Sequence, residues 1–347
     1  MGESCPTMNG RFAVGKNLTR MNVSKPKVVV TDFSFPDLST EEQILSAAGC
    51  EFSGRQCRAE AELVELCQEA DAVITQYAPI TSAVIGAMTR AVAIVRYGIG
   101  VDNVDLEAAR ARGIPVCNVP DYCIDEVADH TLAFILAATR QVVSHTSHLR
   151  AGNWGLAVPL SAMKTLRQMT LGVVGFGRIG RAVTRRLAPF NCKLLVADPA
   201  VAPPEIERLG ARPAPLDELL RNADLITLHC PSTPQTRKLV NRDTLARLKP
   251  GSILINVGRG DLVDTPALVE ALEAGRLGAA ALDVFDPEPI PANHPVLKMP
   301  NVILTPHVAS ASPTAMKKLR ETAATLALMA VRGEALPNIV NGVKPRA

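Results

Sequence analysis

The chain has 347 residues, of which 47% are hydrophobic, 20% charged and 3% aromatic, a composition typical of a globular protein with room for two cores. Its 37 basic and 34 acidic residues leave a net charge of +3, too small and too dispersed to indicate a nucleic-acid partner. No apolar run approaches the ~20 residues that cross a bilayer, so we expect no membrane partner either.

Short β-branched runs alternate with helical stretches in the first part of the chain. Residues 1–25 are polar and basic, and we expect a flexible leader there. From Lys27 the runs KVVVTD, DAVITQ, AVAIVRYG and IPVCNV predict strands, with a helix near residues 40–48. This alternation is typical of a parallel sheet with helices on both faces. A long helix is predicted from Asp125 to about Arg150, where it would cross between domains.

A second series of strands and helices begins at residue 170. Its predicted strands are TLGVVGFG, KLLVADP, ADLITLHC, SILINVGRG, GAAALDVF and NVILTPH, and helical patterns separate them, which indicates a doubly wound unit. A further helix predicted over residues 313–332 would return the chain to the first unit. The first domain would then be discontinuous and would contain both ends of the chain.

A glycine-rich segment after the first strand of this second series predicts a dinucleotide site. Gly175, Gly177 and Gly180 form GxGxxG where an apolar strand turns into a helix. The first glycine permits the tight turn, the second lets a pyrophosphate approach the backbone, and the third allows close helix-to-strand packing. Asp198 ends the next strand, where a carboxylate binds the ribose hydroxyls and repels a 2′-phosphate. The pattern therefore predicts NAD as the cofactor.

These patterns together predict an α/β fold with two doubly wound, Rossmann-like domains. Residues 26–124 and 307–347 would form a discontinuous, flavodoxin-like substrate domain, and residues 125–306 the NAD-binding domain. Ligands of open α/β sheets bind at the carboxyl ends of the strands, so functional side chains are expected there.

Three polar side chains follow predicted strands of the second series. Arg259 lies in NVGRG, Glu288 in DVFDPEP and His307 in TPH. Reduction of a keto acid needs a cation for the carboxylate and carbonyl oxygen, and it needs a proton donor that titrates near neutral pH. Arginine and histidine meet these needs, and a glutamate on the other ring nitrogen would orient the imidazole and keep it protonated. Beside a dinucleotide motif, the three residues predict a catalytic site.

The cysteines and the remaining histidines are expected to have structural roles. The eight cysteines include no CxxC pair and no zinc-ligand spacing, which favours a reducing, cytoplasmic location. His130, His145, His148, His229 and His294 have no carboxylate or cysteine at metal-ligand spacing and are expected to be helix, core or loop histidines. We therefore expect no metal site.

The chain resembles the D-isomer-specific 2-hydroxyacid dehydrogenase family over about residues 27–341. The matching motifs are GFGRIG with Asp198, NVGRG, DVFDPEP, TPH and, earlier in the chain, RYGIGVDN. The resemblance implies an NAD-dependent enzyme that interconverts a small D-2-hydroxy acid and its 2-keto acid. The family's catalytic arginine, glutamate and histidine fall on the three residues named above. Family practice and the long helix over residues 125–150 also imply a homodimer.

The resemblance also implies which residues bind the two ligands. Asp283 falls on the family's nicotinamide-contacting aspartate, and amides around Ile99 and Gly100 would hold the substrate carboxylate. The expected cofactor contacts are Gly175, Phe176, Gly177, Arg178, Ile179, Gly180, Asp198, Cys230, Pro231, Thr236, Val257, Gly258, Arg259, Asp283, His307 and Ser310. The expected substrate contacts are Gln76, Tyr77, Arg96, Ile99, Gly100 and Arg259. The side chain of the substrate stays open.

Two other roles within the family are alternatives. VITQYAPIT, IVRYGIGVDN and VCNVPDYCIDEVADHT resemble the branch of the C-terminal-binding-protein corepressors, which are NAD(H)-responsive scaffolds, but Ser310 stands where those proteins carry Trp. Phosphoglycerate dehydrogenases have a substrate-binding arginine at the position of Arg96, but residues 76–79 lack the arginine and lysine of their facing loop. Glu288 argues against formate dehydrogenases, which carry Gln there.

Overall fold

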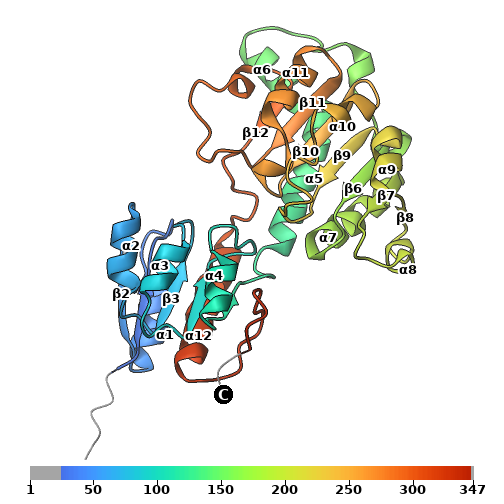
Figure 1. Ribbon diagram of the computed structural model, residues 1–347. Coiled ribbons are helices and arrows are strands. Elements are labelled where there is room, and N and C mark those ends of the chain that lie inside the picture. The colour runs from blue at the N-terminus through green and yellow to red at the C-terminus, as the bar shows by residue number, and fades with distance from the viewer. Residues whose placement is uncertain (1–24, 345–347) are drawn as a thin grey trace, which may run out of the picture.

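The protein, described by a computed structural model over residues 25–344, folds into two lobes, each built on one parallel sheet between helices (Figure 1). The chain passes between the lobes twice, once before residue 124 and once after residue 304, so the first lobe contains segments from both parts of the chain. The predicted fold class, two doubly wound units with the first discontinuous, is confirmed. Within residues 25–344 no helix combines the length and apolar character that crossing a membrane requires.

The first lobe has five parallel strands in the order β2-β1-β3-β4-β5. They are β1 (Lys27–Val30), β2 (Glu51–Gly54), β3 (Ala72–Thr75), β4 (Ala93–Arg96) and β5 (Val116–Cys117). Helices α1 (Ser39–Ala47) and α12 (Pro313–Val331) cover one face, and α2 (Glu60–Cys67), α3 (Ser82–Ala87) and α4 (Leu106–Ala111) cover the other. Because both faces are covered, Val28, Val29 and Val30 in the central part of the sheet are fully buried.

The second lobe has seven parallel strands in the order β12-β11-β10-β9-β6-β7-β8. They are β6 (Thr170–Val174), β7 (Lys193–Ala197), β8 (Arg212–Pro213), β9 (Leu225–Leu228), β10 (Ser252–Asn256), β11 (Leu277–Leu282) and β12 (Val302–Leu304). The strand order reverses between β6 and β9, so the loops after these two strands open a crevice at the carboxyl edge of the sheet.

Helices cover both faces of this second sheet as well. Helices α5 (Ile124–Arg140) and α7 (Arg178–Leu187) pack on one face, and α9 (Leu216–Asn222), α10 (Arg242–Arg247) and α11 (Thr265–Glu273) pack on the other. Helix α8 (Pro203–Glu207) precedes the edge strand β8. Short 3-10 turns are η1 (Leu160–Ala162), η2 (Leu166–Gln168), η3 (Ala188–Phe190), η4 (Gly260–Leu262) and η5 (Pro295–Lys298).

The long helix predicted over residues 125–150 is two helices, so that prediction was wrong in its continuity. Gln141 adopts the left-handed conformation with φ of 55°, which ends α5 and precedes α6 (Val142–Arg150). The Gln141 side-chain amide donates to the carbonyl oxygen of Ala138 at 2.9 Å, which satisfies one of the free carbonyls at the end of α5. The break was missed because no glycine marks it and because the hydrophobic pattern of the sequence continues through it.

Candidate active site

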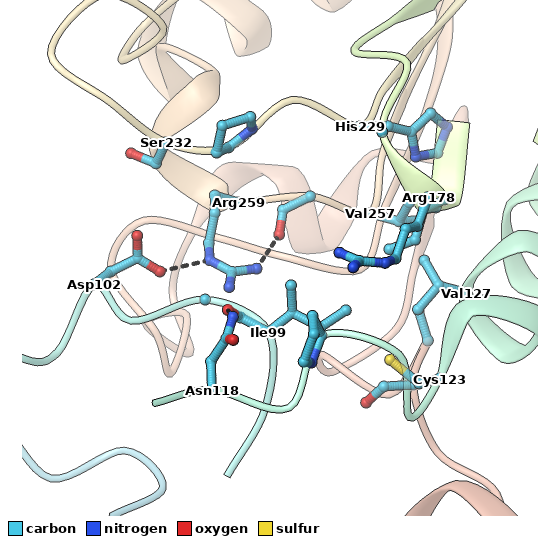
Figure 2. A pocket seen from close by; sticks show the side chains of 18 of the residues that line it. Ile99, Asp102, Asn118, Cys123, Val127, Arg178, His229, Ser232, Val257 and Arg259 are labelled. Carbon is cyan, nitrogen blue, oxygen red and sulfur yellow. Dashed lines mark hydrogen bonds and ion pairs between the residues drawn. The ribbon is translucent and has the colours of Figure 1, made fainter. Parts of the chain in front are cut away.

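A cavity of about 390 Å³ lies between the two lobes at the carboxyl ends of the strands (Figure 2). The loops after β4 and β5 line it from the first lobe, and the loops after β6, β9, β10, β11 and β12 line it from the second. The predicted site residues in its lining are Arg96, Ile99, Gly100, Gly177, Arg178, Ile179, Cys230, Pro231, Val257, Gly258, Arg259, Asp283, His307 and Ser310. Most loops that the sequence associated with cofactor or substrate therefore meet in one place.

The glycine-rich loop after β6 has the shape that a dinucleotide pyrophosphate needs. Gly175 has φ of +92°, and a Cβ there would come within 2.5 Å of the Cys230 amide nitrogen. A Cβ on Gly180 would collide with the carbonyl oxygen of Gly175, so only glycine lets α7 pack this closely on β6. At Gly177, by contrast, a Cβ would meet no atom within 4 Å, which leaves room at the first turn of α7. The loop thus fits the cofactor that its sequence predicts.

Asp198 at the end of β7 is held against this loop. Its Oδ2 accepts the Phe176 amide N–H at 2.6 Å, and its Oδ1 accepts the Ala200 amide N–H at 2.9 Å. The Phe176 ring itself is fully buried, with the Arg181 guanidinium 4.9 Å from its centroid, so Phe176 offers its backbone to the site. The Asp198 carboxylate stays partly exposed beside the loop, where a ribose would lie next to the bound pyrophosphate.

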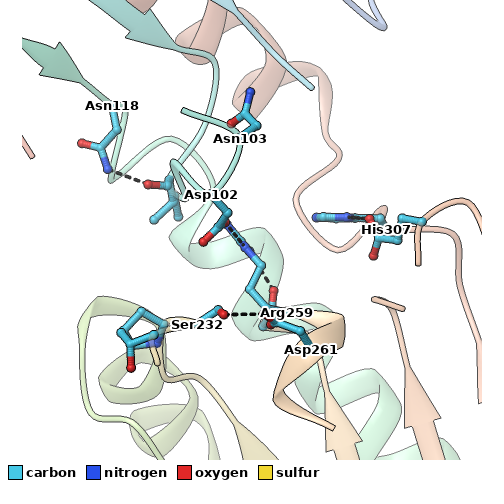
Figure 3. A network of polar contacts seen from close by, with 12 residues as sticks. Asp102, Asn103, Asn118, Ser232, Arg259, Asp261 and His307 are labelled. Carbon is cyan, nitrogen blue, oxygen red and sulfur yellow. Dashed lines mark hydrogen bonds and ion pairs between the residues drawn. The ribbon is translucent and has the colours of Figure 1, made fainter. Parts of the chain in front are cut away.

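Arg259 points into the cavity from the turn after β10. The buried Asn256 side chain holds that turn, because its amide donates to the Arg259 carbonyl at 2.8 Å and its oxygen accepts the Gly258 N–H at 3.1 Å. The guanidinium is oriented across the lobes: Nε donates to Asp102 Oδ2 at 2.8 Å, and Nη1 donates to the Gly258 carbonyl at 2.7 Å (Figure 3). A Cβ on Gly100 would collide with Nη2. Glycine at that position is what lets Nη2 reach the substrate side of the cavity.

His307 and Glu288 form the second half of the site. Glu288 Oε2 lies 2.7 Å from His307 Nδ1, and Oε1 accepts the Phe285 amide N–H at 2.8 Å. Burial by itself raises the pKa of Glu288, but the hydrogen bonds from His307 and Phe285 and the nearby charges outweigh it, so the net pKa is lowered. The glutamate is therefore ionised at neutral pH, and its bond to Nδ1 leaves Nε2 of His307 for the cavity that this ring lines.

Arg96 adds another guanidinium to the cavity that Arg178 and Arg259 also line. Burial, and then the positive charge of Arg259, lower the pKa of Arg96 from its ordinary value. Its Nε is buried without a hydrogen-bond partner among residues 25–344. A Cβ on Gly98 would overlap Nη1 of Arg96, so the side chain lies directly against that glycine. Three arginines line this cavity and one of them, Arg96, is incompletely bonded, which creates a site for an anionic ligand.

Some predicted site residues do not line the cavity. Gln76 is buried, and its side chain bonds to the backbone N–H and the hydroxyl of Ser34 at 2.6 and 2.9 Å. Tyr77 is 55% exposed, outside the lining. Thr236 donates its hydroxyl to the Pro231 carbonyl at 2.6 Å and so shapes the loop after β9. For these three, as for the other residues expected to bind a ligand, a direct contact stays a prediction.

Several lining residues were not singled out by sequence reasoning. Asp102, which orients Arg259, lies within the quoted motif RYGIGVDN, so an ionic partner for the arginine could have been sought there. Burial raises the pKa of Cys123 to about 11, which keeps a thiol in the wall, and no local signal marked this residue. His229, which was expected to be a structural histidine, also lines the cavity; burial lowers its pKa to about 3, and its Nε2 is 2.9 Å from Thr227 Oγ1, so the ring is neutral.

The family model described as D-isomer specific 2-hydroxyacid dehydrogenase, NAD binding domain, matches residues 132–309. The chain belongs to this family. The match confirms the NAD-binding domain that the glycine-rich segment predicted.

Named relatives and one solved structure show how much of the chain is shared. The chain is 38% identical over 281 residues to D-3-phosphoglycerate dehydrogenase of Mycobacterium leprae, covering 81% of this chain and 53% of the relative. It is 37% identical over 282 residues to glyoxylate reductase of Korarchaeum cryptofilum, covering 80% of this chain and 85% of the relative. A crystal structure of Aquifex aeolicus D-lactate dehydrogenase complexed with NAD and lactic acid superimposes with a TM-score of 0.81 at 27% identity, covering 88% and 96% of the two chains. The chain spans about half the length of the mycobacterial relatives.

Proposed function

We propose that the protein is an NAD-dependent D-2-hydroxyacid dehydrogenase that interconverts a small 2-hydroxy acid and its 2-keto acid. The observation that carries the proposal is that Arg259 and His307 line one cavity together with the glycine-rich loop, and that Glu288 is bonded to the His307 ring. In this proposal residues 26–124 and 307–347 form the substrate domain, and residues 125–306 the NAD-binding domain. The names of the relatives, a glyoxylate reductase among them, support the same class of reaction.

The chain's own residues would bind the acid and move the proton. Arg259 would hold the substrate carboxylate and carbonyl oxygen through its guanidinium. In reduction, His307 would give the Nε2 proton to the carbonyl oxygen as it becomes a hydroxyl, and the ring would end neutral. Glu288 would stabilise the protonated ring before that transfer. A bound nicotinamide supplies the hydride that C2 receives, and oxidation reverses each of these steps.

A panel of 2-keto acids tests this proposal. Purified protein with NADH and glyoxylate, pyruvate, hydroxypyruvate or longer keto acids is expected to reduce at least one of them at about 1 per second or faster. The reaction is followed by the loss of NADH absorbance, and NADH binding is measured separately by fluorescence. Tight NADH binding without turnover of any acid contradicts the proposal and favours an NAD(H)-responsive scaffold.

Arg96 favours a second candidate, a substrate that carries a phosphate. A phosphorylated 2-keto acid brings more negative charge than its carboxylate alone, and the incompletely bonded guanidinium of Arg96 could take that charge while Arg259 holds the carboxylate. Comparing hydroxypyruvate with 3-phosphohydroxypyruvate separates the candidates. A higher kcat/KM for the phosphorylated acid supports phosphoglycerate dehydrogenase-type activity, and a lower one supports the unphosphorylated acid.

Asp198 is expected to make the enzyme strongly prefer NADH over NADPH. Like charges about 4 Å apart repel by ~4 kcal/mol at an effective dielectric constant of ~20, so kcat/KM should differ by at least ~100-fold. Asp198→Asn should reduce that ratio, whereas Asp217→Asn, which changes an acid on α9, should leave it as in the wild type. Equal use of both cofactors by the wild type would show that Asp198 does not face the ribose.

Glu288→Gln is expected to shift the pH dependence of the reaction. The substitution keeps a hydrogen-bonding side chain next to Nδ1 but removes the negative charge that favours the protonated ring of His307. Reduction needs that proton, so the rate of reduction should begin to fall at a lower pH in the variant than in the wild type. Oxidation needs the neutral ring, so its rise should also begin at lower pH. Glu273→Gln, at an exposed glutamate of α11, is the matched control, and identical profiles for all three proteins would break the proposed coupling.

A homodimer is also part of the proposal. An exposed apolar surface, here called the arm, runs from α6 to η1 and consists of Val142, Val143, Leu149, Trp154, Leu156 and Leu160. Trp154 is 92% exposed and Leu160 is 71% exposed, and large apolar side chains grouped in this way are usually covered by a partner. Family practice makes a second copy the partner that we propose.

The arm can be tested by sedimentation. The wild-type protein is expected to sediment as two chains, and Trp154→Ser combined with Leu160→Ser to weaken dimerisation by at least ~10-fold, because both side chains would lose an apolar partner surface. Leu297→Ser removes an exposed leucine outside the arm and should leave the dimer intact. A wild-type protein that stays a single chain at micromolar concentration would contradict the proposal.

We further propose a cytoplasmic location. The seven cysteines within residues 25–344 are all free, which supports a reducing compartment because oxidising compartments favour disulfides. Thiol titration of the denatured protein from freshly lysed cells measures this directly. Disulfide-linked cysteines in that material would contradict it.

A further inference from the structure

A histidine outside the catalytic set contacts the loop that carries His307. His130 lies on α5, and its Nε2 is 3.1 Å from the hydroxyl oxygen of Thr305, which follows β12. Thr305 in turn donates to Asp283 Oδ1 at 2.5 Å. His130 Nε2 is 4.0 Å from that same oxygen, too far for a direct hydrogen bond, so the threonine hydroxyl bridges the two.

Asp283 is the point to which the catalytic loop is attached. The residue is fully buried at the end of β11, and its carboxylate also accepts the Val308 N–H at 2.8 Å and the Ala309 N–H at 2.9 Å. Its backbone carbonyl accepts the His307 N–H at 2.7 Å. The backbone N–H groups of His307 and of the two residues after it are therefore all bonded to Asp283.

His307 needs this attachment because its backbone is strained. Its φ is 53°, in the left-handed region, which residues with a Cβ rarely adopt. Such a conformation persists only where surrounding bonds hold it. If the Asp283 carboxylate turned, the bonds to Val308 and Ala309 would lengthen, and the imidazole would move with the backbone.

Which group donates in each of the two hydrogen bonds of Thr305 follows from its single hydroxyl proton. Thr305 has one hydroxyl proton, and its short bond to the acceptor-only carboxylate of Asp283 uses it. The hydroxyl oxygen can then only accept from His130, so Nε2 of His130 carries a proton. The edge of the His130 ring is also packed against Phe134, with centroids 4.4 Å apart, which holds the donor in place.

We propose that His130 and Thr305 are positioning residues that act through Asp283 to hold His307 in place. His130 fixes the Thr305 hydroxyl, the hydroxyl fixes the rotation of the Asp283 carboxylate, and the carboxylate holds the backbone of residues 307–309. The inference rests on the proposed function, in which His307 moves the proton. His130, Thr305 and Asp283 are here called the array. A displacement of about 1 Å at the reacting group can cost ~100-fold in rate, so loss of the array should lower kcat.

Single and double substitutions test the order of this array. Thr305→Val keeps the shape but removes the hydroxyl, and kcat is expected to fall by up to ~100-fold. Thr305→Ser should restore most of the rate. His130→Leu should cost less, about tenfold, and His130→Gln, which can still donate, less again. Because His130 acts through Thr305, the double variant Thr305→Val/His130→Leu should be no slower than Thr305→Val alone.

The matched control is Thr139→Val. Thr139 is buried on α5 and its hydroxyl bonds to carbonyls of its own helix, the nearer at 2.7 Å, so this variant reports the stability cost of a buried threonine without touching the array. Rates that multiply in the double variant overturn the proposal. So does a Thr305→Val enzyme with wild-type kcat, or one that loses no more kcat than the Thr139→Val control.

Hydrogen exchange supplies a readout that needs no turnover. The Val308 and Ala309 amides should exchange about tenfold faster in Thr305→Val than in the wild type, with recovery in Thr305→Ser, in peptides that cover residues 303–310. Unchanged exchange in Thr305→Val overturns the array even if the enzyme is active. If the wild type reduces no keto acid, the proposed function fails, and the array is judged by this exchange alone.

Discussion

Replacing His307 by Asn is expected to lower kcat for keto acid reduction by about 10²- to 10⁴-fold, the usual contribution of a positioned general acid. Asparagine is the informative substitution because it tolerates the left-handed backbone that position 307 adopts, so the loop can keep its shape. The amide cannot give up a proton to the carbonyl oxygen. NADH binding should persist, since the glycine-rich loop is unchanged.

The His307→Asn experiment measures steady-state kcat and, separately, the Kd for NADH. His148→Asn, at a histidine of α6 away from the cavity lining, controls for loss of a histidine elsewhere and should keep wild-type activity. A His307→Asn enzyme with full kcat would remove the proton donor from the proposed mechanism. If His307 is the proton donor, the residual rate of the His307→Asn enzyme should no longer show the pH dependence that the wild type shows near neutral pH.

Arg259→Lys is expected to reduce kcat/KM by about 10²- to 10³-fold with the pH profile left in place. Arginine at this position uses Nε for Asp102 and Nη1 for the Gly258 carbonyl while Nη2 remains for the substrate. A lysine ammonium is a point charge on a flexible stem and cannot form these two bonds and a fixed contact to the substrate together. Loss of a preorganised charged donor at a developing alkoxide costs rates of this order.

The control for Arg259→Lys is Arg247→Lys. Arg247 pairs with Asp217 on the surface, where exchange of arginine for lysine should leave kcat/KM unchanged. Initial rates across a pH series separate the two effects, since the arginine acts on binding and the histidine on the proton. A shifted profile in Arg259→Lys, or a kcat/KM within threefold of the wild type, would contradict the roles that we propose.

Local patterns were enough to predict the inner strands of both sheets and the residues that carry the chemistry, but the edge strands β2 and β8 were missed. GxGxxG between an apolar strand and a helix indicates a dinucleotide site, and the glycines are required there because a Cβ on Gly175 or Gly180 would collide with backbone atoms. Arg259, Glu288 and His307 could be predicted as a group because parallel strands bring their carboxyl ends to one edge. Gln141 shows the limit: a left-handed residue other than glycine ended a helix whose apolar pattern continued.

The partners of these residues were decided by the tertiary structure. Asp102 orients Arg259 from 157 residues away, and His130 reaches Thr305 across 175 residues. No spacing or motif in the sequence links the members of either pair. The first pair forms where the loop after β4 meets the turn after β10, and the second forms where α5 packs on the second sheet. The sequence by itself determined which side chains could bind an anion, a dinucleotide or a proton, because those capacities belong to the residue types and their local backbone. Which atom of each side chain is left free for the cavity depended on hydrogen bonds that only the tertiary structure sets, within the second lobe for His307 and between the lobes for Arg259.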